Sequence, residues 1–244
     1  MLNIQNRWCL ITGASRGVGR EMAKLLASLG ANLVLQSRSR EHCKAVEDFA
    51  RNLGVQTVSV ECDLEKPDSV AAMLSEIDAT GLNIEFVLNN AGRMSHYFAD
   101  YTANTLDDFH SAMAVNFFSP IQIAYHFLPK MIQNGFGRMQ LTTSGIANEP
   151  ELAAYACAKA ALTKFVKDFA CKLNGSDVMM QLMDPGWLRT DLGGPKAPNA
   201  VESVIPGGVV GILLEKGDSG RFFAAQDFVG MSLEEAVKKA EAIR

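Results

Sequence analysis

Short apolar runs alternate along the chain with longer segments in which apolar residues recur every three or four positions. The apolar runs predict buried strands at 8–12, 33–35, 55–60, 84–88, 138–142, 178–183 and 222–225. The longer segments predict helices at 18–29, 46–53, from 67 onward, 106–115, 120–132 and 152–173. Gly30 is a natural residue after a helix end, and Pro67 suits a first helical position.

Strands that alternate with helices predict right-handed βαβ units and a parallel sheet with helices on both faces. We therefore expect an α/β fold with a single doubly wound, Rossmann-type domain over residues 1–244 and a seven-stranded, mainly parallel sheet. The loop at about 187–205 follows the sixth strand and contains a Gly- and Pro-rich stretch, which predicts a small substrate lid. A Ser-x-x-Glu capping box at Ser232 predicts an extra C-terminal helix at about 232–243, to which the sequence assigns no role.

Composition narrows the possible partners. The 23 basic and 27 acidic residues give a net charge of −4, which argues against nucleic acid as the main partner. No apolar run reaches the ~18–20 residues of a membrane helix, and the first residues lack a signal pattern, so we expect a cytoplasmic protein without a membrane partner. The 5 cysteines and 4 histidines show no CxxC or HExxH spacing, so no metal is expected.

A glycine-rich turn joins the first strand to the first helix. In a doubly wound fold such glycines let the backbone approach a pyrophosphate, and the helix N-terminus offers that anion free N–H groups. The turn therefore predicts a dinucleotide site formed by Gly13, Ser15, Arg16, Gly17, Val18 and Gly19. A turn that is rich in glycine only for its geometry is the alternative interpretation.

The end of the second strand indicates which dinucleotide binds. NAD sites carry a carboxylate about 20 residues past the glycines, whereas this strand runs into Ser37-Arg38-Ser39-Arg40. Arg38 could clamp a 2′-phosphate with help from Arg16, so we expect NADP(H) to be preferred over NAD(H). Solvated surface arginines are the alternative.

Tyr155 and Lys159 are spaced to share one face of a predicted helix. This helix follows the fifth strand, and ligands in open α/β sheets gather beyond the carboxyl ends of strands. A ketone that accepts hydride needs a proton donor at its oxygen. A nearby lysine cation is expected to lower the pKa of the tyrosine from its usual value near 10.

Several motifs, in this order, resemble the short, one-domain branch of the short-chain dehydrogenase/reductase family. They are the glycine-rich turn from Thr12 to Gly19, Cys62-Asp63-Leu64, Asn89-Asn90-Ala91-Gly92, Val115-Asn116, Ser144, Tyr155-x-x-x-Lys159 and Asp184-Pro185-Gly186. The resemblance covers Arg7 to about Gln226. It implies a catalytic tetrad of Asn116, Ser144, Tyr155 and Lys159.

The same resemblance implies further roles. Lys159 would also bind the cofactor ribose, Ser144 would orient the substrate oxygen, and Asn116 would hold a water that links Lys159 to solvent. The implied cofactor contacts are Asp63, Leu64, Asn90, Ala91, Gly92, Tyr155, Lys159, Pro185, Gly186, Trp187 and Thr190. Capping or turn formation is the alternative for Asp63, Asn90 and Thr190.

One spacing departs from the family pattern. Ser144 precedes Tyr155 by 11 residues, a slightly short gap, so Thr142 and Thr143 stay as alternatives for the catalytic hydroxyl. Residues expected to wall the substrate pocket are Met94, Ser95, His96, Phe98, Ile146, Trp187, Leu188 and Leu192.

The leading hypothesis is an NADP(H)-dependent oxidoreductase that transfers hydride between nicotinamide and a small carbonyl compound or secondary alcohol, with Tyr155 as general acid/base. The alternatives are a 3-ketoacyl-carrier-type reductase and a non-catalytic NADP(H)-sensing regulatory protein. The resemblance also implies a homodimer or homotetramer formed through the helices around 106–133 and 152–173.

Overall fold

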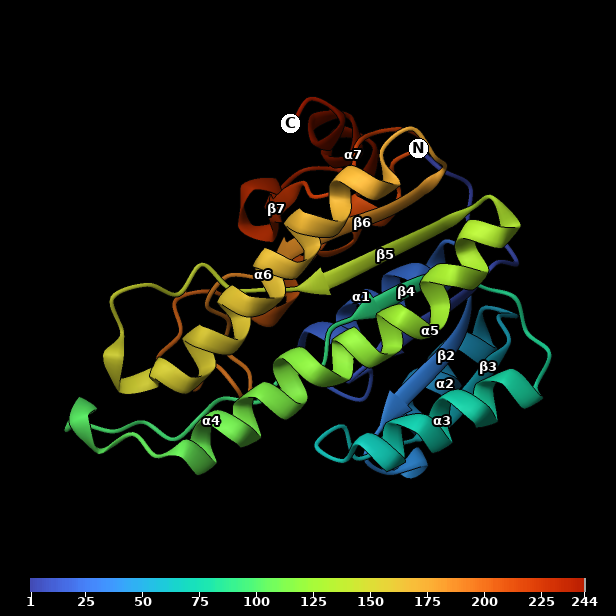
Figure 1. Ribbon diagram of the computed structural model, residues 1–244. Coiled ribbons are helices and arrows are strands. Elements are labelled where there is room, and N and C mark those ends of the chain that lie inside the picture. The colour runs from blue at the N-terminus through green and yellow to red at the C-terminus, as the bar shows by residue number, and fades with distance from the viewer. Residues whose placement is uncertain (244) are drawn as a thin grey trace.

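Seven parallel strands form the centre of the computed structural model, which describes residues 1–243. Their order across the sheet is β3-β2-β1-β4-β5-β6-β7 (Figure 1). Strands β2 and β3 are added on one side of β1 and strands β4 to β7 on the other, so the strand order reverses between β1 and β4. The strands are β1 (Trp8–Thr12), β2 (Asn32–Ser37), β3 (Thr57–Glu61), β4 (Ile84–Asn89), β5 (Gly137–Thr142), β6 (Val178–Asp184) and β7 (Phe222–Ala224). The predicted doubly wound α/β fold is confirmed, and every pairing between these described strands is parallel.

Helices cover both faces of the sheet. In Figure 1 one layer lies in front of the strands and consists of α3 (Pro67–Ala79), α5 (Ser119–Asn134) and α6 (Ala153–Leu173). The layer behind the strands contains α1 (Gly17–Ser28) and α2 (Lys44–Asn52). At the carboxyl end of the chain, the predicted extra helix is present as α7 (Leu233–Glu241), and Ser232 and Glu235 form the expected capping box.

The path from residue 106 to residue 134 differs from the sequence prediction. Two separate helices were expected, but α4 (Leu106–Met113) continues into α5 through a π-helical turn, Ala114–Phe118. Pro120 lies in the first turn of α5, where its missing N–H is tolerated. A π turn inserts one extra residue into a helix, so the apolar pattern shifts its phase while the chain keeps its direction.

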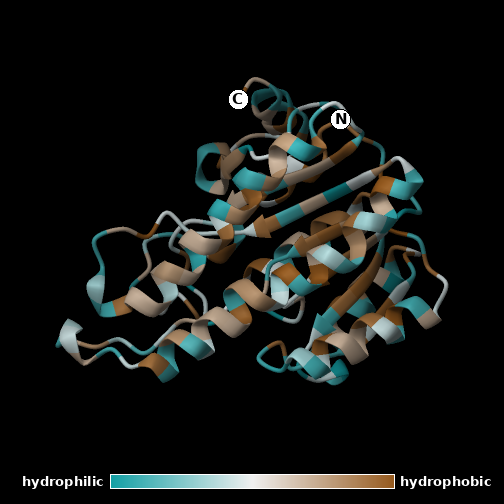
Figure 2. Ribbon diagram, viewed as in Figure 1, coloured by the Kyte–Doolittle hydropathy of each residue, from teal (hydrophilic) through white to brown (hydrophobic). Residues whose placement is uncertain are grey.

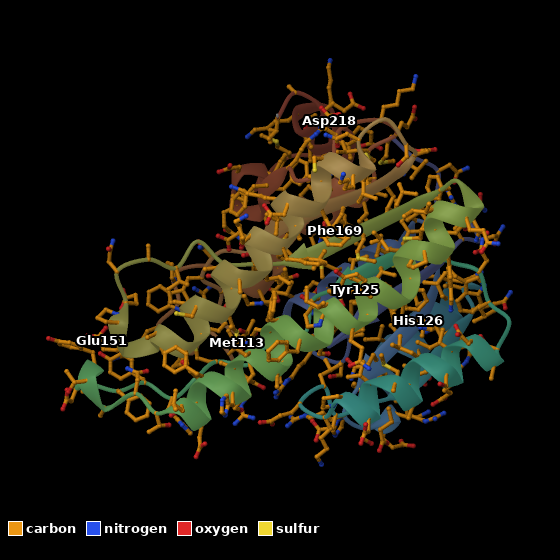
Figure 3. All side chains as sticks on the ribbon, in the orientation of Figure 1. Met113, Tyr125, His126, Glu151, Phe169 and Asp218 are labelled. Carbon is orange, nitrogen blue, oxygen red and sulfur yellow. The ribbon has the colours of Figure 1, made fainter. Side chains whose placement is uncertain are left out.

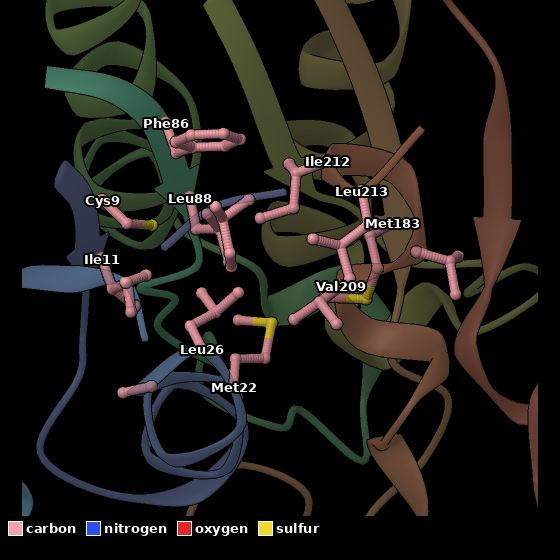
Figure 4. Close-up of a cluster of buried hydrophobic side chains, with 14 of the residues drawn as sticks. Cys9, Ile11, Met22, Leu26, Phe86, Leu88, Met183, Val209, Ile212 and Leu213 are labelled. Carbon is pink, nitrogen blue, oxygen red and sulfur yellow. The ribbon is translucent and has the colours of Figure 1, made fainter. Parts of the chain in front are cut away.

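Each face of the sheet has its own hydrophobic core. Successive side chains of a strand point to opposite faces, so Ile11 packs toward α1 whereas Leu10 packs toward α3 and α5. The core on the α1 side includes Met22 and Phe86 together with Ile212 from the segment after β6 (Figure 4). Apolar residues predominate in the strands, although β5 also carries hydrophilic residues along its length (Figure 2).

The carboxyl ends of all strands meet at one edge of the sheet. There the segments 93–105 and 145–152 project beyond the strands, and Figure 3 labels Glu151 at this end. The backbone N–H of Phe98 donates to the carbonyl of Glu151 at 3.1 Å, and Asn104 Nδ2 donates to the carbonyl of Pro150 at 3.2 Å. These bonds join the two segments beside the predicted site.

No helix in residues 1–243 combines the length and the apolar composition that crossing a membrane requires.

Candidate active site

The glycine turn packs tightly against the end of β4. Gly13 and Gly17 have positive φ angles of +65° and +56°, which favour glycine. A Cβ on Gly19 would lie 2.2 Å from the carbonyl oxygen of Gly13 and 2.6 Å from Asn90 Nδ2. Because Asn90 Nδ2 in turn donates to the carbonyl of Thr12 at 3.0 Å, the turn has little freedom to retreat. The strand end and the turn therefore form one rigid surface.

The N-terminus of α1 points its backbone donors out of this turn. Arg16, at the N-cap position, provides no side-chain cap, and the first turn contains no acidic residue. The N–H groups of the first turn, around Gly17 and Val18, therefore have no acceptor within the helix and can donate to a bound ligand. Ser15 lies half-buried next to them. A backbone without Cβ atoms beside a helix N-terminus fits the pyrophosphate of a dinucleotide.

The two arginines expected at the 2′-phosphate differ in their surroundings. Arg16 forms an ion pair with Asp191 in the loop that follows β6. Arg38 lies exposed just after β2, and within the described chain it has no ion-pair partner. Arg38 is near Asp63, because its charge contributes to the lowered pKa of that carboxyl. Arg38 is thus the arginine available to an anion, whereas Arg16 is engaged.

Asp63 forms a local turn after β3. Its Oδ1 accepts a hydrogen bond from the backbone N–H of Glu65 at 3.1 Å, which is the main cause of its lowered pKa. Lys66 lies 3.2 Å from its other oxygen. Leu64 is buried in the core next to α3. The geometry matches the turn-forming interpretation of Asp63, and its half-exposed carboxylate still faces Arg38.

The four expected catalytic residues come together around Gly92. A Cβ on Gly92 would lie 3.2 Å from Asn116 Oδ1 and 3.7 Å from Lys159 Nζ. The Lys159 ammonium donates to the carbonyl of Thr142 at 2.7 Å and lies 5.8 Å from the centre of the Tyr155 ring. The Ser144 side chain lies near Tyr155, because it acts to lower the pKa of the phenol. Strand β5, helix α6 and the π turn thus each contribute to one site.

Both polar atoms of the Asn116 amide are hydrogen-bonded within the chain. Its Oδ1 accepts from the backbone N–H of Arg93 at 3.1 Å, and its Nδ2 donates to the carbonyls of Arg93 and Ala112 at 2.8 and 2.9 Å. The side chain therefore fastens the segment after Gly92 to the π turn. This fastening is a structural role of Asn116; the expected role of holding a water stays a prediction, because the amide oxygen has a second lone pair.

The direction of the tyrosine pKa is opposite to the expectation. Burial raises the pKa of Tyr155 to about 12, and the nearby Asp184 carboxylate adds to this rise, while the Ser144 side chain opposes it. Burial also lowers the pKa of Lys159 to about 8, against the attraction of Asp184. The expected lowering of the phenol pKa by the lysine cation is not found; desolvation of the phenolate sets the direction of the shift. Tyr155 is accordingly a protonated acid at neutral pH.

The three hydroxyls at the end of β5 have separate partners. The Thr143 hydroxyl shares a 2.6 Å hydrogen bond with the hydroxyl of Thr163 in α6, and Thr142 offers its backbone carbonyl to Lys159. Ser144 Oγ accepts from the backbone N–H of Ile146 at 3.2 Å, and of the three hydroxyls it is the one that affects the pKa of Tyr155. Ser144 is therefore the hydroxyl that reaches the tyrosine.

The loop after β6 begins with a closely packed turn. Gly186 has a φ of +79°, and a Cβ there would lie 2.6 Å from the side chain of Gln226. Gln226 Nε2 donates to the carbonyl of Pro185 at 2.9 Å, which holds the turn against the segment after β7. The position of Pro185 and Gly186 beside β5 and β6 places them at the same sheet edge as Ser144.

The rest of this loop faces the glycine turn. A Cβ on Gly17 would lie 3.5 Å from the Thr190 methyl group, and Thr190 Oγ1 accepts from the backbone N–H of Gly193 at 3.0 Å. Trp187 is 58% exposed, and its Nε1 donates to the carbonyl of Gly193 at 2.7 Å. Thr190 thus forms a turn within the loop, in place of the helix cap that was its alternative interpretation, and it is a neighbour of the glycine turn.

Two expected pocket walls have other roles. Leu188 is buried, and its backbone pairs with Asn199. His96 Nδ1 lies 2.6 Å from Asp108 Oδ1, so this exposed ring is held at the start of α4. The described residues contain no group of three or more His, Cys, Asp or Glu side chains that could hold a metal ion.

The sequence analysis missed two polar residues that organise the site. Gln36 accepts from the N–H of Gly13 at 3.0 Å and donates to the carbonyl of Cys62 at 2.9 Å, so it ties the glycine turn to β2 and β3. Asp184 accepts from the N–H groups of Gly145 and Gly186 at 2.7 and 2.9 Å. The only sequence signal for these two residues was a polar residue within, or at the end of, an otherwise apolar strand.

Comparison with known proteins places this geometry in a family. A model of the short chain dehydrogenase family matches residues 7–200. A fatty acyl-CoA reductase from Acinetobacter baylyi is 31% identical over 165 residues, which are 67% of this chain and 56% of the relative. A 3-oxoacyl-(acyl-carrier-protein) reductase FabG from Aquifex aeolicus is 30% identical over 194 residues, 78% of this chain and 77% of the relative. The chain thus spans little more than half of the first relative.

Solved structures have the same fold. A metagenomic short-chain oxidoreductase in complex with NADP has a TM-score of 0.74 at 27% identity, covering 88% of this chain and 95% of that protein. An NAD⁺-bound xylitol dehydrogenase has a TM-score of 0.78 at 23% identity, covering 91% and 98%. Because the family model extends from the first strand past the Tyr155–Lys159 pair into the loop after β6, the chain belongs to the short-chain dehydrogenase family.

Proposed function

We propose that this protein is an NADP(H)-dependent oxidoreductase that interconverts a small carbonyl compound and a secondary alcohol. The observation that carries the proposal is the meeting of Ser144, Tyr155 and Lys159 at the carboxyl edge of the sheet, next to Gly92. The site combines a buried proton donor, Tyr155, with the nearby hydroxyl of Ser144 and the buried amine of Lys159. These are the groups that carbonyl reduction requires around the reacting oxygen.

Each residue has a defined part in the proposed reaction. Tyr155, protonated at neutral pH, donates its proton to the substrate oxygen, and Ser144 orients that oxygen through its hydroxyl near Tyr155. Lys159 binds the cofactor ribose and keeps a positive charge beside the phenol. Asn116 holds the Gly92–Arg93 segment in place beside Lys159. The bound cofactor supplies the hydride.

The proposed preference for NADP(H) over NAD(H) rests on the second strand. The glycine cradle at Gly13, Gly17 and Gly19 accommodates either dinucleotide, so discrimination falls to the end of β2. There Arg38 is exposed without an ion-pair partner in the described chain. An exposed guanidinium at that position favours a 2′-phosphate over a free 2′-hydroxyl. The relatives do not decide the preference, because NADP-bound and NAD⁺-bound proteins both have this fold.

The remaining proposed cofactor contacts come from segments at the carboxyl edge of the sheet. We propose that Asp63 and Leu64, after β3, contact the adenine, and that Asn90, Ala91 and Gly92, after β4, contact the middle of the cofactor. Pro185, Gly186, Trp187 and Thr190 border the nicotinamide end, in the segment 187–205 that we propose as the substrate loop of a single catalytic domain.

A 3-ketoacyl-carrier-type reductase is the second candidate. The similarity to the Aquifex aeolicus acyl-carrier-protein reductase favours it. A carrier with a phosphopantetheine arm needs free cations at the rim of the site. Of the three nearby cations, Arg93 is paired with Glu65 and Arg189 donates to the carbonyls of Ala197 and Pro198, which leaves the exposed Lys196 without an ion pair in the described chain. We therefore rank a free small-molecule substrate above a carrier-bound one.

One experiment tests the proposed function. The purified protein is assayed on a panel of ketones, aldehydes, alcohols and 3-ketoacyl thioesters with NADPH, NADH and their oxidised forms. We expect turnover of a free carbonyl compound with NADPH, and loss of turnover in Tyr155→Phe with NADPH affinity within about twofold of the wild type, because the hydroxyl acts on the substrate. Tight NADPH binding without turnover of any compound would favour the NADP(H)-sensing alternative. Equal turnover by Tyr155→Phe would reject the mechanism.

We also propose a homodimer or homotetramer through α4, α5 and α6. Tyr125 of α5 is 56% exposed, and its ring packs at 5.7 Å between centroids against Phe169 of α6 on the outer surface (Figure 3). Phe118 is 56% exposed at the start of α5. Aromatic residues on a helical face are enriched where chains associate. Light scattering of the purified protein tests the assembly, and a cytoplasmic location stays a prediction from composition.

A further inference from the structure

Asp184 connects the two loops that flank the proposed reaction centre. It is the last residue of β6, next to β5 in the sheet. Its Oδ2 accepts from the backbone N–H of Gly145 at 2.7 Å, and its Oδ1 accepts from the backbone N–H of Gly186 at 2.9 Å. One carboxylate thus holds the turn that carries Ser144 and the turn that contains Pro185. Nothing else in the described chain bridges these two N–H groups.

The fit around this carboxylate is close. A Cβ on Gly145 would lie 2.9 Å from Asp184 Oδ2, so the turn after Ser144 can approach only because residue 145 is glycine. Gly186 has a positive φ of +79°, which favours glycine, and its N–H reaches the carboxylate two residues back. Hydrogen bonds from N–H groups to an ionised carboxylate are stronger than bonds between neutral groups. The contact therefore restrains both turns more firmly than a neutral side chain would.

We propose, on the basis of the oxidoreductase function above, that Asp184 is a positioning residue that fixes the Ser144–Gly145 turn against the Pro185–Gly186 turn. Ser144 is the hydroxyl that lowers the pKa of Tyr155, whereas Asp184 holds the backbone of the next residue, Gly145. A displacement of about 1 Å at a reacting group can cost about a hundredfold in rate. Holding Ser144 and the nicotinamide-side turn at a constant separation is thus a requirement of the proposed chemistry.

The charge of Asp184 has a second consequence at the same place. The titratable groups that it faces are Tyr155 and Lys159 of α6, and the carboxylate raises the pKa of both. The charged groups of its own loop point elsewhere, because Asp191 pairs with Arg16 and Arg189 donates to loop carbonyls. Asp184 therefore favours the state in which Tyr155 carries its proton and Lys159 is charged, which is the state that donates a proton to a carbonyl.

The test compares Asp184→Asn with Gly145→Ala. The asparagine keeps the shape but loses the charge and one of the two acceptors, whereas Gly145→Ala pushes the same turn away and keeps the charge. We expect kcat/KM for the carbonyl substrate to fall at least about tenfold in both variants because Ser144 is displaced. Only Asp184→Asn should move the alkaline inflection of NADPH affinity, near the Lys159 pKa of about 8, to lower pH.

NADPH affinity is measured by fluorescence titration at a series of pH values, so this readout does not depend on turnover. Asp184→Glu keeps the charge and should keep the wild-type inflection. The proposal is overturned if Asp184→Asn matches the wild type in kcat/KM, or if its pH inflection moves no further than that of Gly145→Ala. If the wild-type protein turns over no carbonyl compound while the inflection moves as expected, the proposed function fails and the electrostatic role of Asp184 stands.

Discussion

Gly19 has no space for a side chain, and replacing it with alanine tests the rigidity of the cofactor turn. The new Cβ would lie 2.2 Å from the Gly13 carbonyl oxygen and 2.6 Å from Asn90 Nδ2, whereas non-bonded atoms prefer about 3.5 Å. The turn must therefore move by about 1 Å or more. Such a movement separates Asn90 from the carbonyl of Thr12, which it now reaches at 3.0 Å.

Opposing effects determine how much Gly19→Ala changes the free energy of unfolding. Alanine in place of glycine within a helix gains about 1 kcal/mol at most. Overpacking costs about 1–3 kcal/mol, and a buried donor left without its acceptor costs about 1–3 kcal/mol more. The losses win, and we expect Gly19→Ala to lower the free energy of unfolding by about 3 kcal/mol. For a domain of this size that lowers Tm by about 6–12 °C.

Cofactor affinity separates a local effect from a global one. Because Gly19 lies in the first turn of α1, we expect the Kd for NADPH to rise at least about tenfold, which equals about 1.4 kcal/mol. Gly137→Ala is the matched control: its Cβ would lie 2.4 Å from the Met131 side chain at the opposite edge of the sheet. The control should lose stability and keep its Kd. If Gly19→Ala retains both the wild-type Tm and the wild-type Kd, the reasoning from steric contact is refuted.

Three further predictions concern cofactor choice, stability and pH. Arg38→Ala should weaken NADPH binding at least about tenfold and NADH binding less than about twofold; equal losses in fluorescence titrations would contradict the 2′-phosphate assignment. Arg138 is 1% exposed and donates to the carbonyls of Asp177, Leu214 and Glu215. Arg138→Met should therefore cost about 3 kcal/mol in thermal unfolding, whereas Asp177→Asn, at a side chain that is 58% exposed, should cost below about 1 kcal/mol. Finally, burial lowers the pKa of Lys159 to about 8, so the charged amine is lost as pH rises through that value. We expect kcat/KM for NADPH, which reports the free enzyme, to fall above about pH 8, and a flat profile to pH 10 would show that the amine charge is not needed.

Local pattern accounts for most of the fold. The strands and the helices α1, α3, α6 and α7 lie within a few residues of their predicted positions, because buried strands and amphipathic helices leave periodic apolar residues in the sequence. The run from α4 to α5 was the exception, since a π turn changes the phase of that period without ending the helix.

The residue types of the site were also readable from the sequence, since Tyr155 and Lys159 are near neighbours on one helix and the glycine turn is continuous. Their chemistry was not. The partner of Arg16 is Asp191, which lies 175 residues away, and the contact of Gly145 with Asp184 spans 39 residues. No local period encodes such pairs, because strand order and loop packing create them.

The sequence by itself determined the alternation of strands and helices, the glycine turn and the order of the motifs. Only the tertiary structure decided that Gly92, Asn116 and Lys159 meet, that Ser144 is the hydroxyl beside Tyr155, and that the tyrosine pKa rises. A pKa depends on how much water the fold removes and on which charges it brings near, and both are properties of three-dimensional packing.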